Sequence, residues 1–240
     1  MTDSIILCSP GTDFVLPYIK AELPGVTILP PDAGRRADLA VMLSSCDIYG
    51  DGPRENCYEE YTLSSASPWL AMEDKFAADC RRTGTPYVIL RCADIIGTGM
   101  TGFTRSLAND IWRGTFFHFP GNDARRSVVH ATDIARIVHA LAHGGLPSSG
   151  LNIFNVSDGT DPSIHDIAEA LAYRMCNKRI STLSTRPQQV IGRFLYGKKK
   201  VAAYTTTRTF SAARLVRELA FKAVPACEYL RTHIYDDNSL

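Results

Sequence analysis

The sequence predicts an α/β fold in which a parallel sheet has helices on both faces. Short apolar runs of the length of buried strands alternate with stretches that have helical spacing, which is the pattern of parallel strands joined by crossover helices. Length and composition agree, because 240 residues, 45% of them apolar, can fill one large core and little more. No low-complexity linker or solenoid repeat divides the chain, so we expect a single domain over residues 1–240.

The first ninety residues supply most of the expected sheet. We expect strands at 5–8, 26–29, 39–43 and 87–90, with helices at 14–23 and 68–83. A turn, Ser9-Pro10-Gly11-Thr12, joins the first strand to the first helix.

Later segments have clearer helix signals. Thr132 is placed to cap a helix that carries an apolar stripe and ends at Gly144. Ser163 and Asp166 have the spacing of a capping box at the start of another helix. Between these two helices, the stretch 151–156 alternates apolar and polar residues and reads as a strand.

Charge and composition exclude several classes of protein. The 26 Lys and Arg residues against 25 Asp and Glu leave a net charge of +1, which argues against a nucleic-acid partner. No apolar run approaches the roughly 20 residues that cross a bilayer, and residues 1–4 lack the basic segment of a secretory signal. We therefore expect a soluble, cytoplasmic protein with no membrane partner.

The cysteines and histidines suggest neither disulfides nor a metal. Seven widely spaced cysteines without a Cys-x-x-Cys pair read as reduced, mostly buried thiols. The six histidines have no ligand-like spacing, so no metal site is expected.

Five segments, in this order along the chain, carry a resemblance to a known family. They are LSSCDIYG at 43–50, LRCADIIGTG at 90–99, PGN at 120–122 followed by RSVVHATD at 126–133, the strand 152–158, and the closing helix 210–221. From Leu39 to its end, the chain resembles the extended short-chain dehydrogenase/reductases, the NAD-dependent epimerase/dehydratase family that works on nucleotide sugars.

The resemblance implies a shortened, Rossmann-like doubly wound sheet with a small C-terminal α/β substrate lobe, formed mainly by about 100–125 and 157–240. It implies NAD or NADP as cofactor, a nucleotide sugar as ligand, and a homodimer formed through long helices that include 68–83. Arg126 matches the arginine that forks onto the substrate's diphosphate, and Asp94 stands where many relatives carry an asparagine that bonds the sugar or its phosphate.

The cofactor turn departs from the family pattern. Pro10, Asp13 and Leu16 stand where the family has the three glycines of its phosphate-binding turn, and only Gly11 and Thr12 agree with the pattern. Pro10 has no N–H to donate, and Asp13 would place a carboxylate beside two phosphates. We therefore expect ordinary dinucleotide binding to be impaired, so the cofactor implied by the family need not be held here.

The chain is also short before its second motif. About thirty residues separate the first strand from Ser45, where the family typically has about a hundred. One or two strand-helix units of the cofactor half are therefore expected to be missing.

The catalytic motif is incomplete. Ser45 matches the family's catalytic Ser/Thr. Lys75 can be aligned with the lysine of Tyr-x-x-x-Lys, in which case Ala71 replaces the tyrosine. The alternative alignment, on Ser67-Pro68, puts Trp69 at the tyrosine and Glu73 at the lysine. Neither alignment keeps a phenol that could move a proton.

Two ways of keeping some chemistry without the usual phenol stay open. Tyr49 or Tyr61 could replace it, and Ser45, Cys46 or Cys92 could instead act as a nucleophile near a carboxylate.

The leading hypothesis is an epimerase/dehydratase-like protein of nucleotide-sugar or surface-polysaccharide metabolism with lost or altered catalysis. One alternative is a non-catalytic subunit that binds a nucleotide sugar or a protein partner. Another is an active NAD(P)-dependent sugar-nucleotide epimerase or dehydratase.

Overall fold

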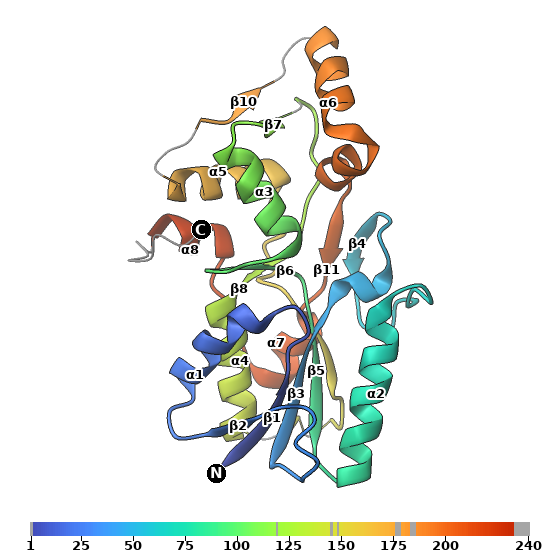
Figure 1. Cartoon of the computed structure of the whole chain (residues 1–240), viewed down its shortest axis with the longest axis vertical. Coiled ribbons are helices and arrows are strands. Elements are labelled where there is room, and N and C mark those ends of the chain that lie inside the picture. Colours follow the sequence, from blue (N-terminus) through green and yellow to red (C-terminus); the bar gives the residue numbers. More distant parts are fainter. Residues whose placement is uncertain are drawn as a thin grey trace.

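Five parallel strands in the order β2-β1-β3-β5-β9 form the centre of the molecule (Figure 1). They are β1 (Ser4–Cys8), β2 (Thr27–Leu29), β3 (Leu39–Ser45), β5 (Tyr87–Cys92) and β9 (Ile153–Val156). The computed structural model describes residues 2–118, 120–144, 146–147, 149–175, 179–182 and 186–232. All five strands fall where the apolar runs predicted them.

Helices cover both faces of this sheet, which confirms the doubly wound α/β prediction. On one face lie α1 (Leu16–Glu22), α4 (Ala131–Gly144) and α7 (Ala213–Leu219), against alternate strand residues such as Val41 and Leu43. On the other face lies α2 (Pro68–Thr83), against Ala40 and Met42. Because side chains alternate along a strand, each face is buried under its own helices.

Of the two helix caps that the sequence predicts, one is confirmed. The helix α5 (Ile164–Arg174) begins with the predicted capping box of Ser163 and Asp166. Thr132 does not cap α4, because that helix already begins at Ala131. The Nδ1 atom of the buried His130 accepts the Thr132 N–H instead, at 3.2 Å, so a ring nitrogen takes the place of the predicted hydroxyl.

The connection from β2 to β3 is unusually short. It comprises nine residues, 30–38, and crosses the sheet without a helix. Parallel crossovers usually need a dozen or more residues and contain a helix, and the common doubly wound sheet has six strands in the order 3-2-1-4-5-6. The strand that carries Ser45 therefore pairs directly with β1.

A second apolar cluster forms a lobe beyond the carboxyl ends of the strands (Figure 1). Its elements are α3 (Gly102–Trp112), β7 (Phe117–His118), β10 (Ser181–Thr182), α6 (Arg186–Thr205, kinked at Gly197), α8 (Ala226–Thr232) and α5. The helix α7 lies within the range expected for the lobe but packs beside β9 of the sheet. The lobe boundaries remain a prediction.

Two short strand pairs and two 3-10 turns lie beside the main sheet. The strand β4 (Arg54–Cys57) pairs with β11 (Arg208–Phe210), and β6 (Asp94–Ile96) pairs with β8 (Val128–His130). The 3-10 turn η2 (Cys46–Tyr49) follows β3 directly, and a similar turn η1 (Asp13–Val15) precedes α1. These pairings bring residues from distant parts of the sequence to one edge of the sheet.

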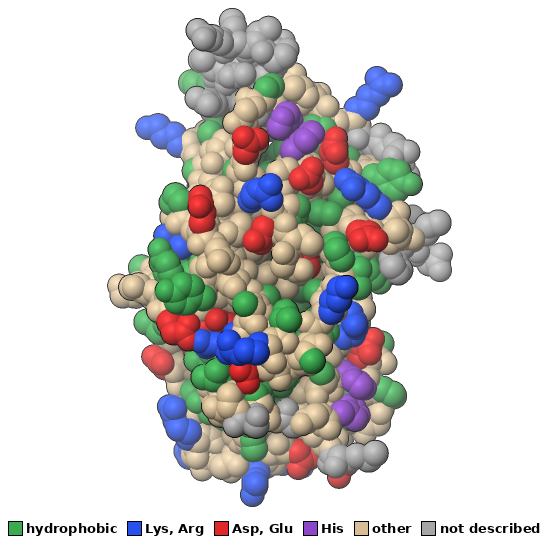
Figure 2. Space-filling model, turned by 180° about the vertical axis from the view of Figure 1, so that it is seen from behind, with side chains coloured by type: hydrophobic (Ala, Val, Ile, Leu, Met, Phe, Trp, Pro, Cys, Tyr) green, Lys and Arg blue, Asp and Glu red, His purple; other side chains and the backbone are tan. Residues whose placement is uncertain are grey.

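Surface chemistry agrees with the balanced composition. On the face shown in Figure 2, basic and acidic side chains are interspersed and neither sign dominates. Among the helices that the structure describes, none is both long and apolar enough to cross a membrane. The described cysteines are all free thiols, and Cys46, Cys57, Cys80 and Cys92 are buried as expected; Cys176 lies outside the described residues.

Candidate functional site

The predicted site residues collect at the carboxyl edge of the sheet. Gly11 and Thr12 follow β1, Ser45 ends β3, and Asp94 comes two residues after β5. In open α/β sheets, ligands bind in the crevice outside the carboxyl ends of the strands. The topology therefore brings to one edge residues as far apart in the sequence as Gly11 and Asp94.

The two predicted ligand residues contact each other. Arg126 Nη1 donates to Asp94 Oδ2 at 2.9 Å, across the start of the β6–β8 ladder. The Arg126 side chain is only 6% exposed, so its charge depends on this carboxylate and on the Phe103 ring, whose centroid lies 3.6 Å from the guanidinium carbon. Asp94 thus occupies one side of the arginine that was expected to bind diphosphate.

A second arginine, not singled out in the sequence, completes the cluster. Arg208 forms an isolated bridge with Arg126 on the neighbouring strand, and its Nη1 donates to Asp47 Oδ1 at 2.9 Å. The Nε atoms of both arginines are buried, and neither has a hydrogen-bond partner among the described atoms. The two guanidinium groups place two positive charges at this edge of the sheet, and the two aspartates partly neutralise them.

Burial shifts the titration of this cluster. It raises the pKa of Asp94 above its ordinary value, and the Arg126 charge opposes that rise. It also lowers the pKa of Arg126, while Asp94 acts in the opposite direction. Both shifts have the same cause, because low dielectric disfavours each charged form.

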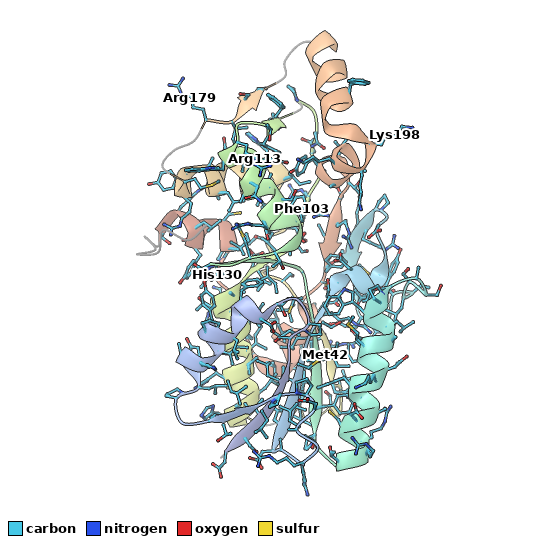
Figure 3. All side chains as sticks on the ribbon, viewed as in Figure 1. Met42, Phe103, Arg113, His130, Arg179 and Lys198 are labelled. Atoms are coloured by element: carbon cyan, nitrogen blue, oxygen red, sulfur yellow. The ribbon has the colours of Figure 1, made fainter. Side chains whose placement is uncertain are left out.

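Aromatic side chains of the lobe support Arg126 from behind. Phe103 on α3 lies in the lobe, whereas Met42 lies in the sheet below, as Figure 3 shows. The Tyr204 ring meets Phe103 edge to face with centroids 5.9 Å apart, and its hydroxyl donates to Asp110 at 2.5 Å. Tyr204 therefore holds the Phe103 ring against which the Arg126 guanidinium packs.

Ser45 lies at the carboxyl end of β3 and is partly exposed. Its hydroxyl accepts the Asp47 N–H at 3.0 Å and so caps η2. The same turn carries Asp47 to Arg208. Ser45 therefore has a local structural role beside its predicted catalytic one.

The two alignments of the catalytic helix fall on different sides of α2. Glu73 is buried against the sheet, accepts the Ser44 hydroxyl at 2.6 Å, and pairs with Arg91 Nη2 at 2.8 Å. Lys75 points outward with 81% of its side chain exposed and pairs with Asp79 one turn later. Among these residues, Glu73 and the partly buried Trp69 face the sheet, whereas Ala71 and Lys75 do not.

Tyr49 belongs to the same buried network. Its hydroxyl donates to Asn155 Oδ1 at 2.7 Å and accepts from Arg91 Nη1 at 3.0 Å. Burial raises the pKa of Tyr49 far above its ordinary value. Tyr61, the other expected substitute, is exposed and packs against Tyr58 and Arg54. The hydroxyl of Tyr49 is fully used inside the protein.

The turn after β1 fits a dinucleotide poorly. Pro10 offers no N–H, the Thr12 N–H donates to Ser9 O at 3.1 Å, and Asp13 accepts the Ser9 hydroxyl at 2.8 Å. Asp13 therefore brings a carboxylate to the start of the first helical turn, where a phosphate would sit. Gly11, with φ +70°, and the buried, unpartnered Thr12 hydroxyl are the features that agree with the family pattern.

The loop after β6 closes over this turn. Thr101 Oγ1 donates to Gly11 O at 3.2 Å, and the Thr98 N–H donates to Tyr18 OH at 2.9 Å. A Cβ at Gly99 would lie 3.0 Å from Phe14 Cβ, so this close approach requires a glycine. The loop rests on the segment that should hold the pyrophosphate.

A hollow remains at the carboxyl ends of β1 and β2. It encloses about 920 Å³, part of it open to solvent, beside Pro10, Asp13, Lys20 and Pro30. In a Rossmann-like fold the adenosine half of a dinucleotide lies near this edge. This hollow is the space available here for that half of the cofactor.

The two expected nucleophilic thiols are buried. Cys46 Sγ donates to Arg91 O at 3.1 Å, and burial raises the pKa of this thiol well above its ordinary value. Burial also raises the pKa of Cys92 to about 12. Both groups are therefore protonated and inaccessible at neutral pH.

Solved structures share this fold. RMD from Pseudomonas aeruginosa, solved with NADPH, has a TM-score of 0.66 at 16% identity, with 96% of this chain and 98% of that chain covered. The UDP-N-acetylglucosamine 4-epimerase from Methanobrevibacter ruminantium M1, solved with UDP-N-acetylmuramic acid, gives 0.65 at 14% identity and 98% coverage of both chains. The Bordetella bronchiseptica enzyme WbmH, solved with NAD+, gives 0.64 at 12% identity and full coverage of both. At such identities the likeness shows the fold alone.

Sequence comparison identifies the family. A search of curated proteins found no significant match. Residues 31–156, more than half of the chain, match the model of the NAD dependent epimerase/dehydratase family. The chain therefore belongs to the NAD-dependent epimerase/dehydratase family, whose cofactor is NAD or NADP.

Proposed function

We propose that this protein binds a nucleotide sugar beside Arg126 and Arg208, and that it serves nucleotide-sugar or surface-polysaccharide metabolism. The observation that carries the proposal is the pair of buried arginines, Arg126 and Arg208, whose Nε donors have no partner among the described atoms. A diphosphate offers paired acceptor oxygens of the kind that guanidinium groups bind, and it would reach these buried donors only after neighbouring side chains move aside. The UDP-sugar ligand of the Methanobrevibacter structure is consistent with this class of ligand.

We further propose that nicotinamide chemistry is lost or altered in this chain. Family chemistry needs a phenol that exchanges a proton while the nicotinamide moves hydride. Here the position of the tyrosine is taken by Trp69 or Ala71, and Tyr49 is bonded internally. The Pro10 and Asp13 turn also argues against the usual pyrophosphate pose. The roles of Ser45 and Lys75 in catalysis, and of Gly11 and Thr12 in cofactor binding, remain predictions.

A ligand panel tests the proposal. Thermal unfolding of the full chain would be followed with UDP-, GDP- and dTDP-sugars and with NAD and NADP, because a ligand of the native state raises the melting temperature by mass action. We expect at least one nucleotide sugar to stabilise the protein and both dinucleotides to have no effect at millimolar concentration. Stabilisation by NAD or NADP would favour the active enzyme instead.

A matched pair of arginine variants locates the site. Arg126→Ala should weaken the nucleotide sugar by about 1.5–3 kcal/mol, the range for a hydrogen bond to a charged group. Arg125→Ala is the control, because the adjacent Arg125 is exposed and its Nη1 donates to the main-chain oxygen of Asp161. Equal effects of the two variants would contradict the proposed site.

Two finer expectations remain proposals. A homodimer formed through α2 is one, although the outward side of that helix is mostly polar, with Asp74, Lys75, Arg81 and Arg82 exposed. A cytoplasmic location is the other. If no nucleotide sugar stabilises the chain, the non-catalytic protein-interaction subunit becomes the better hypothesis.

A further inference from the structure

A groove lies on the α2 face of the sheet, and neither Arg126 nor Arg208 lines it. On this face α2 covers β3 and β5, while β1 is crossed only by residues 30–38 (Figure 1). In an ordinary doubly wound sheet a helix in such a crossover would fill the space beside α2. The short connection leaves a groove of about 170 Å³ between itself and α2.

The floor of this groove is apolar. Ile6 and Cys8 of β1 form one side, and Phe76 and Cys80 of α2 form the other. Ile6, Phe76 and Cys80 are buried, and the hydroxyl of Thr83 at the end of the groove is already used by main-chain oxygens of α2. A ligand body that needs hydrogen bonds would lose them on this floor, whereas a hydrocarbon body would not.

The rim of the groove is basic. Arg35, Lys75 and Arg82 line it, with Asp79 as the one acidic group among the lining residues. Asp79 pairs with both Lys75 and Arg82, at 3.1 and 3.3 Å, so one negative charge is shared between two cations. Three positive charges against one negative charge favour an anion at the mouth.

We propose that the groove binds an organic anion with a hydrocarbon body, such as an acyl or aryl carboxylate. The body lies on Ile6, Phe76 and Cys80, and the charged end lies at Arg35 and Lys75. This assignment gives Lys75 a binding role outside catalysis. It is independent of the nucleotide-sugar proposal, because the two sites share no residue.

Alkylation of Cys8 provides the readout, since this half-buried thiol lines the groove. The full chain would be treated with iodoacetamide, and modification of Cys8 would be measured by peptide mass spectrometry with octanoate, octanol or AMP present. We expect octanoate to protect Cys8 at a lower concentration than octanol or AMP, because it has both the hydrocarbon body and the charge. Stronger protection by AMP would overturn the proposal in favour of a nucleotide site, and equal protection by octanol would show that the rim charge has no role.

Rim variants complete the test. Arg35→Ala combined with Lys75→Ala should weaken octanoate about fivefold, as expected for two exposed charge interactions. Arg36→Ala is the matched control, because Arg36 is exposed and does not line the groove. An equal effect of Arg36→Ala would overturn the groove assignment. Loss of octanoate binding in Arg126→Ala would also overturn it, because the ligand would then bind beside Arg126 and Arg208.

Discussion

At the scale of single residues, Asp94 sets the charge that a ligand would meet beside Arg126. It pairs with Arg126, and an aspartate at this position repels a diphosphate that an asparagine would bind. Asp94→Asn should therefore tighten the binding of UDP by about tenfold, which corresponds to about 1.4 kcal/mol. Isothermal titration with UDP measures the change.

Asp47→Asn is the control for this variant. The Asp47 side chain is 56% exposed against 25% for Asp94, so solvent screens it more and its effect should be smaller. If Asp94→Asn weakens UDP or leaves its affinity unchanged, the aspartate does not compete with the ligand.

The same carboxyl predicts a pH dependence. Burial raises the pKa of Asp94, so the folded state takes up a proton at a higher pH than the unfolded state does. Stability from this group is greatest when it is protonated and is lost as pH rises through the raised pKa. Protonated Asp94 also stops competing for Arg126, so UDP should bind the wild type more tightly as pH falls. Asp94→Asn should remove that part of the pH dependence while keeping any contribution from the ligand's own titration.

The thiols give a second prediction at this scale. Burial raises the pKa of Cys46 well above its ordinary value and that of Cys92 to about 12, so neither should react with Ellman's reagent at pH 8 in the native protein. All seven thiols should react in denaturant. Cys8→Ser is the control: Cys8 is partly exposed, so it should account for reagent consumed by the native protein, and this variant should consume less. Rapid modification of Cys46 or Cys92 would restore the nucleophile hypothesis.

The candidate site residues could be predicted from the sequence only where they belong to a family motif. Arg126 and Asp94 were found through the family resemblance, and the structure brings them together. Arg208 and Asp47 were missed because they are 161 positions apart and meet only through the β4–β11 pairing. No local pattern marks such a pair, since its partners are set by tertiary contacts.

At the scale of elements, variants of α2 test which of its charged residues stabilises the fold. Glu73 is the buried partner of Arg91, and removing its charge leaves an uncompensated guanidinium inside the protein. Glu73→Gln should lower the free energy of unfolding by about 3–5 kcal/mol. Urea unfolding followed by circular dichroism measures this change.

Lys75→Gln is the matched control on the same helix. Its side chain is 81% exposed and its pair with Asp79 lies in solvent, so the unfolding free energy should stay close to that of wild type. A large loss in Lys75→Gln together with a small one in Glu73→Gln would contradict the buried network described above.

The elements were predicted better than their caps. The strands and the extent of α2, predicted at 68–83, followed from apolar runs and helical spacing, because these are local signals. The start of α4 was wrong by two residues because the His130 ring, fixed by tertiary packing on Tyr229, replaced the Thr132 cap. Caps that depend on such packing have no sequence signature.

At the scale of the whole molecule, the sheet has five strands and a helix-free connection from β2 to β3. The sequence predicted the shortening from the distance between the first strand and Ser45. It could not predict that β1 and β3 would pair directly, because strand order is decided by long-range contacts. The result is a sheet edge where the cofactor turn and Ser45 lie on adjacent strands.

This shortening predicts that repairing the turn alone does not restore the cofactor site. Pro10→Gly returns an N–H and Asp13→Gly removes the carboxylate, yet the helix-free connection 30–38 and the Thr101 contact to Gly11 remain. The double variant should show no saturable NAD binding by calorimetry at millimolar concentration. The Pro10 change should also lower stability by about 0.4–1 kcal/mol, because glycine frees the unfolded chain. Millimolar or tighter NAD binding by a folded double variant, with none by the wild type, would instead show that the turn chemistry alone opposes the dinucleotide.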